Sequence, residues 1–163
     1  MSETGRDIKI IISGGGTGGH LFPAIAIANA LSRLEPGVKI LFVGAEGKME
    51  MQKVPDAGFE IAGLPVAGLV RGGSIRNIHV AWKLFRSMLR ASRLIKKFSP
   101  DVVVGVGGYA SGPVLKQAQQ RRIPTLIQEQ NSYAGVTNKL LAKKADRICV
   151  AYEGMDKYFP KEK

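Results

Sequence analysis

The chain has 163 residues, 45% of them apolar, so it can bury one sizeable core, and its length fits one domain better than two. Lys and Arg number 24 against 13 Asp and Glu, and this net charge of +11 favours anionic partners such as phosphates, nucleic acid or an acidic lipid surface. The single cysteine, Cys149, excludes an intramolecular disulfide, and the apolar run 8–12 is far too short for a membrane span, so we expect a cytosolic protein with at most peripheral membrane contact.

Short β-rich runs alternate along the chain with longer segments of helical period. Strands are predicted at 9–13, 38–43, 101–104, 125–128 and 147–150, with a weaker one at 59–62 that follows a short helix at 48–56. Continuous apolar strands between helices are typical of a parallel sheet covered on both faces. We therefore predict an α/β fold with a doubly wound, Rossmann-like parallel sheet, whose ligands bind at the carboxyl ends of the strands. Cys149, at the end of the last strand, is expected to be a buried thiol.

A glycine-rich loop, GGGTGGH at 14–20, follows the first strand and precedes a helix that reaches about Leu34. Glycines let the backbone approach a ligand closely, and the N-terminus of the helix presents unpaired N–H groups to a phosphate. Pro23 is placed in the first helical turn, where no donor is lost. No Lys-Ser/Thr pair follows the glycines, which excludes a P-loop. A dinucleotide site is disfavoured because the second strand ends at Gly44 instead of an acidic residue.

His20 is the histidine of this first glycine loop. At the N-terminus of a helix the dipole disfavours the imidazolium form, so the ring should stay neutral and able to accept a proton from a sugar hydroxyl. A structural role, with the ring bonded to the loop backbone, is an equal alternative.

A long helix is predicted over 74–98. The stripe expected to face the core consists of Leu84, Met88, Ala91, Ile95 and Phe98. Cations cluster on the opposite side, beside a second apolar sector, and this combination suits a surface that lies against anionic lipid headgroups. The predicted membrane patch consists of Ile75, Ile78, Trp82, Phe85, Arg86 and Arg90. The alternative is a solvated charged face, with the two aromatic rings packed against the preceding loop.

A second glycine-rich loop, GVGGYASGP at 105–113, follows another apolar strand, and Ser111 is its predicted helix N-cap, with Pro113 in the first turn. Two such loops on different strands can hold one diphosphate from both sides. Alternatively, the glycines only permit tight turns between strand and helix. Glu129 and Asn131 stand at a third strand end, although Asn131 can equally be a helix cap or a turn residue.

Three segments together, GGGTGGHLFPA at 14–24, GVGGYASGP at 105–113 and EQNSYAGVTN at 129–138, resemble the amino-terminal domain of the MurG family of N-acetylglucosaminyltransferases. The match runs in order over nearly the whole chain. The family implies a two-domain GT-B fold that transfers N-acetylglucosamine from UDP-N-acetylglucosamine to the 4-hydroxyl of the muramyl sugar on undecaprenyl diphosphate, with inversion and without a metal or other cofactor. Residues 1–163 would be the acceptor-binding half, and the donor-binding domain would be missing, so this chain alone should not catalyse transfer.

The resemblance also implies roles for individual residues. The acceptor diphosphate would lie against Gly15, Gly16, Gly107, Gly108, Tyr109 and Ser111. The donor would face Thr17, Gly18, Gly19 and Asn131, with His20 as candidate base and Glu129 as a second catalytic candidate. Many family members have His where this chain has Gln128, which puts a catalytic role for that side chain in doubt. The predicted membrane patch would lie on the cytoplasmic face of the inner membrane, where the enzyme would serve cell-wall synthesis and, through it, cell shape and division.

Two other classes of protein compete with this hypothesis. One is a non-catalytic subunit that binds the acceptor, recruits it at the membrane and is completed by a separate donor-binding chain. The other is a nucleic-acid-binding protein. Only the basic charge supports the latter, because no recognition motif and no interleaved aromatic residues accompany that charge.

Overall fold

The computed structural model describes residues 7–66 and 76–163, with only the backbone described at 76–79. Its centre is a parallel six-stranded sheet with the strand order β3-β2-β1-β4-β5-β6. The strands are β1 (Lys9–Gly14), β2 (Lys39–Ala45), β3 (Glu60–Leu64), β4 (Val102–Gly107), β5 (Thr125–Glu129) and β6 (Arg147–Val150). Each lies where the sequence predicts one, so the predicted α/β parallel sheet is confirmed.

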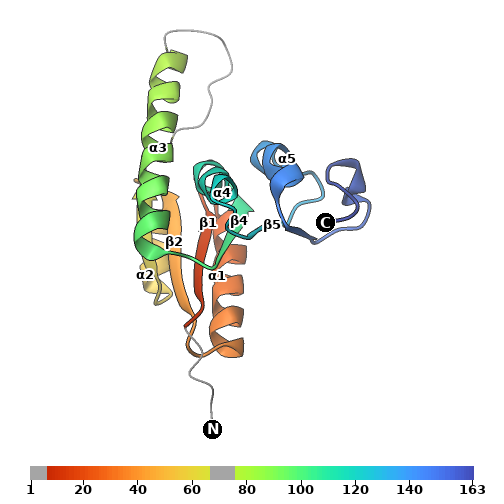
Figure 1. Ribbon diagram of the computed structural model, residues 1–163, viewed down its shortest axis with the longest axis horizontal. Helices are drawn as coiled ribbons and strands as arrows, with labels where there is room; N and C mark the ends of the chain where they lie inside the picture. The colour runs from red at the N-terminus through yellow and green to blue at the C-terminus, as the bar shows by residue number, and fades with distance from the viewer. Residues whose placement is uncertain (1–6, 67–75) are drawn as a thin grey trace.

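Helices cover both faces of the sheet (Figure 1). They are α1 (Gly18–Leu34), α2 (Glu50–Asp56), α3 (Arg76–Phe98), α4 (Ser111–Gln120) and α5 (Val136–Leu141), followed by two 3-10 turns at Ala142–Lys144 and Met155–Lys157. None of the helices in the described part of the chain is both long and apolar enough to cross a membrane.

Two separate apolar layers form the core because both faces of the central strands are buried. On one face Ile11 of β1 packs with Ile95 of α3 and Leu115 of α4. On the other face Ile12 of β1 packs with residues of α1 and α2. Burial of one such large aliphatic side chain is worth about 1.5–3 kcal/mol. Successive side chains of a strand point to opposite faces of the sheet, and both faces are buried at β1. The sequence of β1 is therefore an uninterrupted apolar run without alternation.

The strand order also fixes the position of the site. From β1 the chain runs outward to β2 and β3, and then crosses back to place β4 beside β1. The loops that follow β1 and β4 therefore meet at the carboxyl edge of the sheet, at the point where the strand order reverses. In open α/β sheets this switch point is where ligands bind.

Two predicted helix starts need correction. Helix α1 begins at Gly18, so Pro23 lies in its second turn and not in the first. The helix starts earlier than expected because Thr17 adopts the extended backbone of an N-cap, and the two glycines after it join the helix. Ser111 is the first residue of α4 and not its cap, because its hydroxyl donates to the carbonyl oxygen of Gly108 at 3.0 Å. Pro113 lies in the first turn of α4, as predicted.

Two burial predictions are also wrong. Cys149 is exposed because β6 is an edge strand with a neighbouring strand on one side only, and three of its four residues are exposed. Leu84 is 51% exposed, although Ala91 and Ile95 of the same predicted core stripe are buried. The reason is that the amino-terminal half of α3 projects beyond the six described strands (Figure 1).

Candidate functional site

The two glycine-rich loops touch each other at the carboxyl edge of the sheet. A Cβ atom on Gly108 would lie 2.2 Å from the carbonyl oxygen of Gly15, so a side chain there would displace backbone. Both glycines also have positive φ, +83° at Gly108 and +141° at Gly15, which L side chains rarely adopt. Close approach of the two loops, and not a tight turn alone, therefore requires glycine at position 108, whereas a Cβ atom on Gly15 would meet the carboxylate of Glu50.

Two helices begin at this contact without a side-chain cap. Thr17, at the N-cap of α1, makes no capping hydrogen bond in the described structure, and Ala110, at the N-cap of α4, cannot make one. The first N–H groups of an α-helix have no partner inside the helix, and they give its N-terminus a partial positive charge. Two such termini at neighbouring strand ends form a place for an anion with more than one phosphate.

His20 connects three loops. It is the third residue of α1, and its Nδ1 atom lies 3.0 Å from the carbonyl oxygen of Val106 and 2.7 Å from the Nε2 atom of Gln130. The ring also packs on Gly107, where a Cβ atom would come within 2.9 Å of it. The ring is therefore held by both the second glycine-rich loop and the loop after β5. Both of these polar contacts involve Nδ1 and leave Nε2 out. The ring can therefore be bonded to the loop backbone, as the alternative predicted, and still act as a base through Nε2.

Glu129 organises the loop after β5. Its side chain is fully buried, and its carboxylate accepts four hydrogen bonds. Oε1 accepts from the backbone N–H and the side-chain amide of Asn131, at 3.1 and 3.0 Å, and Oε2 accepts from the N–H of Gly135 and the amide of Asn138, at 2.9 and 3.0 Å. Asn131 is thus a turn residue bonded to Glu129 and does not cap α5, whose N-cap is Gly135.

Glu50, the first residue of α2, is a site residue that the sequence analysis did not identify. Its carboxylate is fully buried, and Oε1 accepts the N–H of Gly16 at 2.9 Å and that of Ala45 at 3.0 Å. The N–H of Gly16 is therefore directed into the protein and not toward a ligand. An acidic residue in the first turn of a helix that follows a strand end was the available indication.

The predicted site residues fall into two groups in the structure. Gly15, Gly107, Ser111 and Glu129 are buried, so they shape the loops and present no surface to a ligand. The exposed or half-buried group consists of Gly16, Thr17, Gly18, Gly19, His20, Gly108, Tyr109 and Asn131. Within residues 7–66 and 76–163, no three His, Cys, Asp or Glu side chains are grouped to hold a metal ion.

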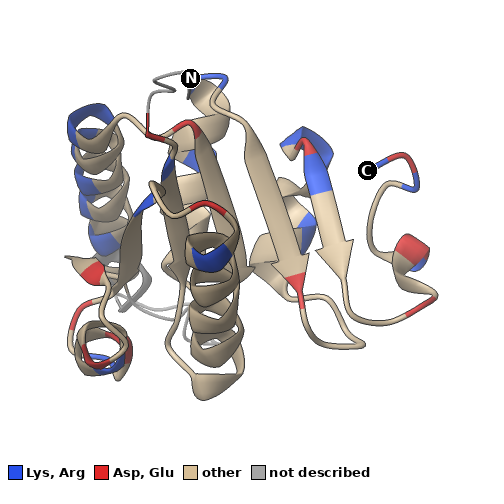
Figure 2. Cartoon of the chain, turned by 90° about the horizontal axis from the view of Figure 1, so that it is seen from below, with Lys and Arg blue, Asp and Glu red and all other residues tan. Residues whose placement is uncertain are grey.

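The predicted membrane patch lies on the projecting half of α3. Trp82 and Phe85 are 57% and 53% exposed, and their rings stack with centroids 5.8 Å apart. Arg86 is exposed beside them, whereas Arg90 is engaged in an ion pair with Glu46. Figure 2 shows the Lys and Arg positions repeated along this helix. Ile75 and the side chain of Ile78 lie outside the described residues.

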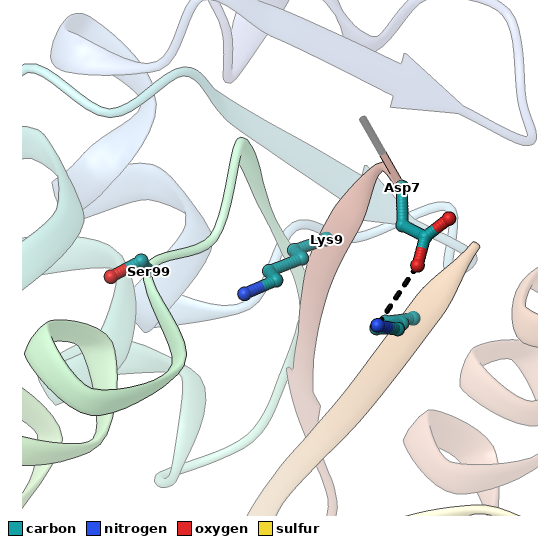
Figure 3. A pocket seen from close by; sticks show the side chains of 4 residues that line it. Asp7, Lys9 and Ser99 are labelled. Carbon is teal, nitrogen blue, oxygen red and sulfur yellow. Dashed lines mark ion pairs between the residues drawn. The ribbon is translucent and has the colours of Figure 1, made fainter. Parts of the chain in front are cut away.

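A pocket of about 310 Å³ is present at the opposite edge of the sheet, lined by Asp7, Lys9, Lys39 and Ser99 (Figure 3). Lys39 forms an ion pair with Asp7 at 2.8 Å, and its hydrogen bond and charge lower the pKa of that carboxyl. The pocket is formed by the amino-terminal ends of the strands, far from the glycine-rich loops. Paired charges and the absence of a glycine loop make it a poor candidate for the functional site.

Comparison with known proteins identifies the family. Residues 10–150 match the glycosyltransferase family 28 N-terminal domain. A transferase of Bacteroides thetaiotaomicron, named UDP-N-acetylglucosamine–N-acetylmuramyl-(pentapeptide) pyrophosphoryl-undecaprenol N-acetylglucosamine transferase, is 65% identical over 97% of this chain. A protein of Flavobacterium psychrophilum with the same name is 58% identical over 95%. The chain spans 42% of the length of each of these relatives.

Solved structures give the same result for the fold. The crystal structure of Acinetobacter baumannii MurG matches 89% of this chain and 42% of its own with a TM-score of 0.78 and 33% identity. A putative UDP-N-acetylglucosamine 2-epimerase from Listeria monocytogenes matches 88% of this chain and 39% of its own with a TM-score of 0.63, but at 16% identity it supports the fold alone. The resemblance drawn from the three sequence segments is thus confirmed.

The contact between the glycine-rich loops predicts a large cost for Gly108→Ala. We expect it to lower the free energy of unfolding by about 3 kcal/mol, because a methyl group would have to displace the Gly15 carbonyl in addition to adopting positive φ. The control is Gly58→Ala, which has φ of +85° but no atom within 4 Å of the new Cβ, and which should cost about 1 kcal/mol. Urea denaturation measures both, and equal costs would contradict the close contact.

The buried carboxylate of Glu50 gives a second prediction. Glu50→Ala leaves the N–H groups of Gly16 and Ala45 without their acceptor and should lower the free energy of unfolding by roughly 2–4 kcal/mol. Glu50→Gln retains an acceptor oxygen and should cost less. Glu60→Ala removes an exposed carboxylate from β3 and is the control. The backbone amide of Gly16 should also exchange its hydrogen faster in Glu50→Ala. An unchanged exchange rate would contradict the hydrogen bond between Glu50 and Gly16.

Proposed function

Because the chain belongs to the glycosyltransferase family 28 N-terminal domain family, we propose that it is the acceptor-binding half of an N-acetylglucosaminyltransferase of peptidoglycan synthesis. The whole protein would transfer N-acetylglucosamine from UDP-N-acetylglucosamine to the muramyl-pentapeptide carried on undecaprenyl diphosphate. The names of relatives with 58–65% identity support this substrate assignment. The relatives are more than twice as long as this chain, which supports a second, donor-binding domain outside residues 1–163.

One observation supports the acceptor role above all others. The uncapped N-termini of α1 and α4 stand at adjacent strand ends, where the two glycine-rich loops touch. A diphosphate in this position accepts hydrogen bonds from both helices and interacts favourably with both dipoles. The half-buried Gly108 and the exposed Tyr109 would contact it directly, whereas the buried Gly15, Gly107 and Ser111 would set the shape of the loops.

The chemistry of transfer assigns a role to His20. The ring accepts the proton of the acceptor 4-hydroxyl while that oxygen forms a bond to the anomeric carbon of N-acetylglucosamine. The bond from this carbon to the UDP oxygen breaks on the opposite side, UDP leaves with the electron pair, and the configuration inverts. General base catalysis of this kind contributes about 10²–10⁴-fold to the rate. Thr17, Gly19 and Asn131, which are exposed at the same edge, would face the donor.

Glu129 has a positioning role in this proposal and not a catalytic one. Its four hydrogen bonds leave the carboxylate without access to a substrate, and one of its partners, Asn131, is a proposed donor contact. We expect the carboxylate to hold the loop after β5 in place while the donor binds.

The exposed rings of α3 favour a peripheral position on the cytoplasmic face of the inner membrane. Trp82 and Phe85 can enter the interface while Arg86 meets anionic headgroups. The substrate's undecaprenyl chain is itself anchored in lipid, so the projecting half of α3 and the acceptor site would meet the same membrane.

Calorimetry on this chain tests the proposed function. We expect a soluble, short-chain analogue of the muramyl diphospholipid to bind on the order of tenfold more tightly than UDP-N-acetylglucosamine, because the acceptor site is present and the donor domain is not. An otherwise identical monophosphate analogue is the control and should bind more weakly, since it reaches one helix terminus. Tight binding of the nucleotide sugar alone would mean that the site between the glycine-rich loops belongs to another ligand.

Vesicle sedimentation tests the membrane patch. The double variant Trp82→Ala, Arg86→Glu should bind anionic phosphatidylglycerol vesicles about tenfold more weakly or worse, because it loses an inserted ring and reverses a charge. Arg90 is left unchanged because of its ion pair with Glu46. The matched control, Leu34→Ala, Lys97→Glu, changes the same charge and an exposed apolar residue elsewhere. Equal binding by the two variants would rule out a specific patch on α3.

A further inference from the structure

The side chain of Gln130 contacts the ring of His20 on the side away from its Nε2 atom. One end of the Gln130 amide, assigned as Nε2, lies 2.7 Å from Nδ1, and the carbonyl oxygen of Val106 lies 3.0 Å from the same atom. Both partners are partly buried, and the sequence analysis assigns no role to Gln130. Two polar groups therefore meet a single ring nitrogen, which has room for one hydrogen at most.

The carbonyl of Val106 decides which form the ring takes. A carbonyl oxygen can only accept, so at 3.0 Å it requires a hydrogen on Nδ1. In the neutral ring the hydrogen then resides on Nδ1, and Nε2 has the free lone pair. The opposite tautomer would place two lone pairs against each other at Nδ1 and would occupy Nε2 with a hydrogen, so that it could not accept a proton.

The hydrogen on Nδ1 of His20 also orients the amide of Gln130. An amide nitrogen 2.7 Å from an N–H group would set donor against donor, whereas the amide oxygen can share the Nδ1–H with Val106. Oxygen and nitrogen of an amide are assigned from such contacts. With the nitrogen toward the ring, Oε1 is buried without a hydrogen-bond partner among the described residues, so a half-turn of the amide gives up no hydrogen bond there.

We propose that Gln130 is a positioning residue, whose amide oxygen accepts from Nδ1–H of His20 and so keeps Nε2 unprotonated for the acceptor hydroxyl. When Nε2 takes up a proton, the same oxygen stabilises the positive charge of the ring, against the dipole of α1. The tautomer is a property of this chain. Its use in transfer depends on the function proposed above.

The tautomer can be measured in this chain by long-range ¹H–¹⁵N NMR correlation at a pH where the ring is neutral. His79→Gln in every sample leaves His20 as the sole histidine. We expect the signals of an Nδ1-protonated ring. Gln130→Leu should lower the ratio of the Nδ1–H to the Nε2–H form about fivefold, the effect of one hydrogen bond. Gln130→Glu, which can only accept, should restore the ratio.

The control Gln120→Leu makes the same change on the exposed end of α4 and should leave the ring signals unaltered. An Nε2-protonated ring in the unsubstituted chain, or an unchanged ratio in Gln130→Leu, would overturn the proposal. In the full-length transferase, Gln130→Leu should lower kcat on the order of tenfold with KM nearly unchanged. If the full-length protein transfers no sugar although the NMR result holds, the proposed function fails and the ring geometry stands.

Discussion

The close approach of the backbone at Gly15 and Gly108 is the constraint on which the site depends. No side chain fits between these loops, so the ends of β1 and β4 meet directly, and the N-termini of α1 and α4 are brought to the same point. Buried carboxylates hold the surrounding loops: Glu50 binds the backbone of the first glycine-rich loop, and Glu129 binds the loop after β5. Amide groups donate to both oxygens of Glu129 but only to Oε1 of Glu50, whose Oε2 is buried without a partner among the described residues. Such hydrogen bonds are costly to break in a buried setting.

Contact and positioning are divided between different residues. The exposed or half-buried groups described at this edge include His20, whose imidazole ring is the proposed base. The residues behind them are buried and hydrogen-bonded, which limits how far the exposed groups can move. Preorganisation of this kind reduces the reorganisation needed when a transition state forms.

The sequence was sufficient to predict the sheet and the edge at which the site lies. Parallel strands buried on both faces are continuous apolar runs, and their carboxyl ends must share one edge, so the three motifs converge. The partners of Glu50 could not be predicted, because Gly16 lies 34 residues away in sequence and only the packing of α2 brings them together. The predicted burial of Leu84 and Cys149 is wrong because the sequence pattern shows which face of an element is apolar. It does not show where the sheet ends, and both residues lie at or beyond its limits.

The projection of α3 beyond the sheet would affect how the proposed lipid-bound acceptor is found. From Trp82 to Leu89 the helix rises about 10 Å along its axis, at 1.5 Å per residue, and Trp82, Leu84, Phe85 and Leu89 are exposed there. A protein that rests on a bilayer through this segment searches for its acceptor in two dimensions and at a fixed height. The packing of Ala91 and Ile95 against the sheet would then set the orientation of the glycine-rich loops relative to the membrane.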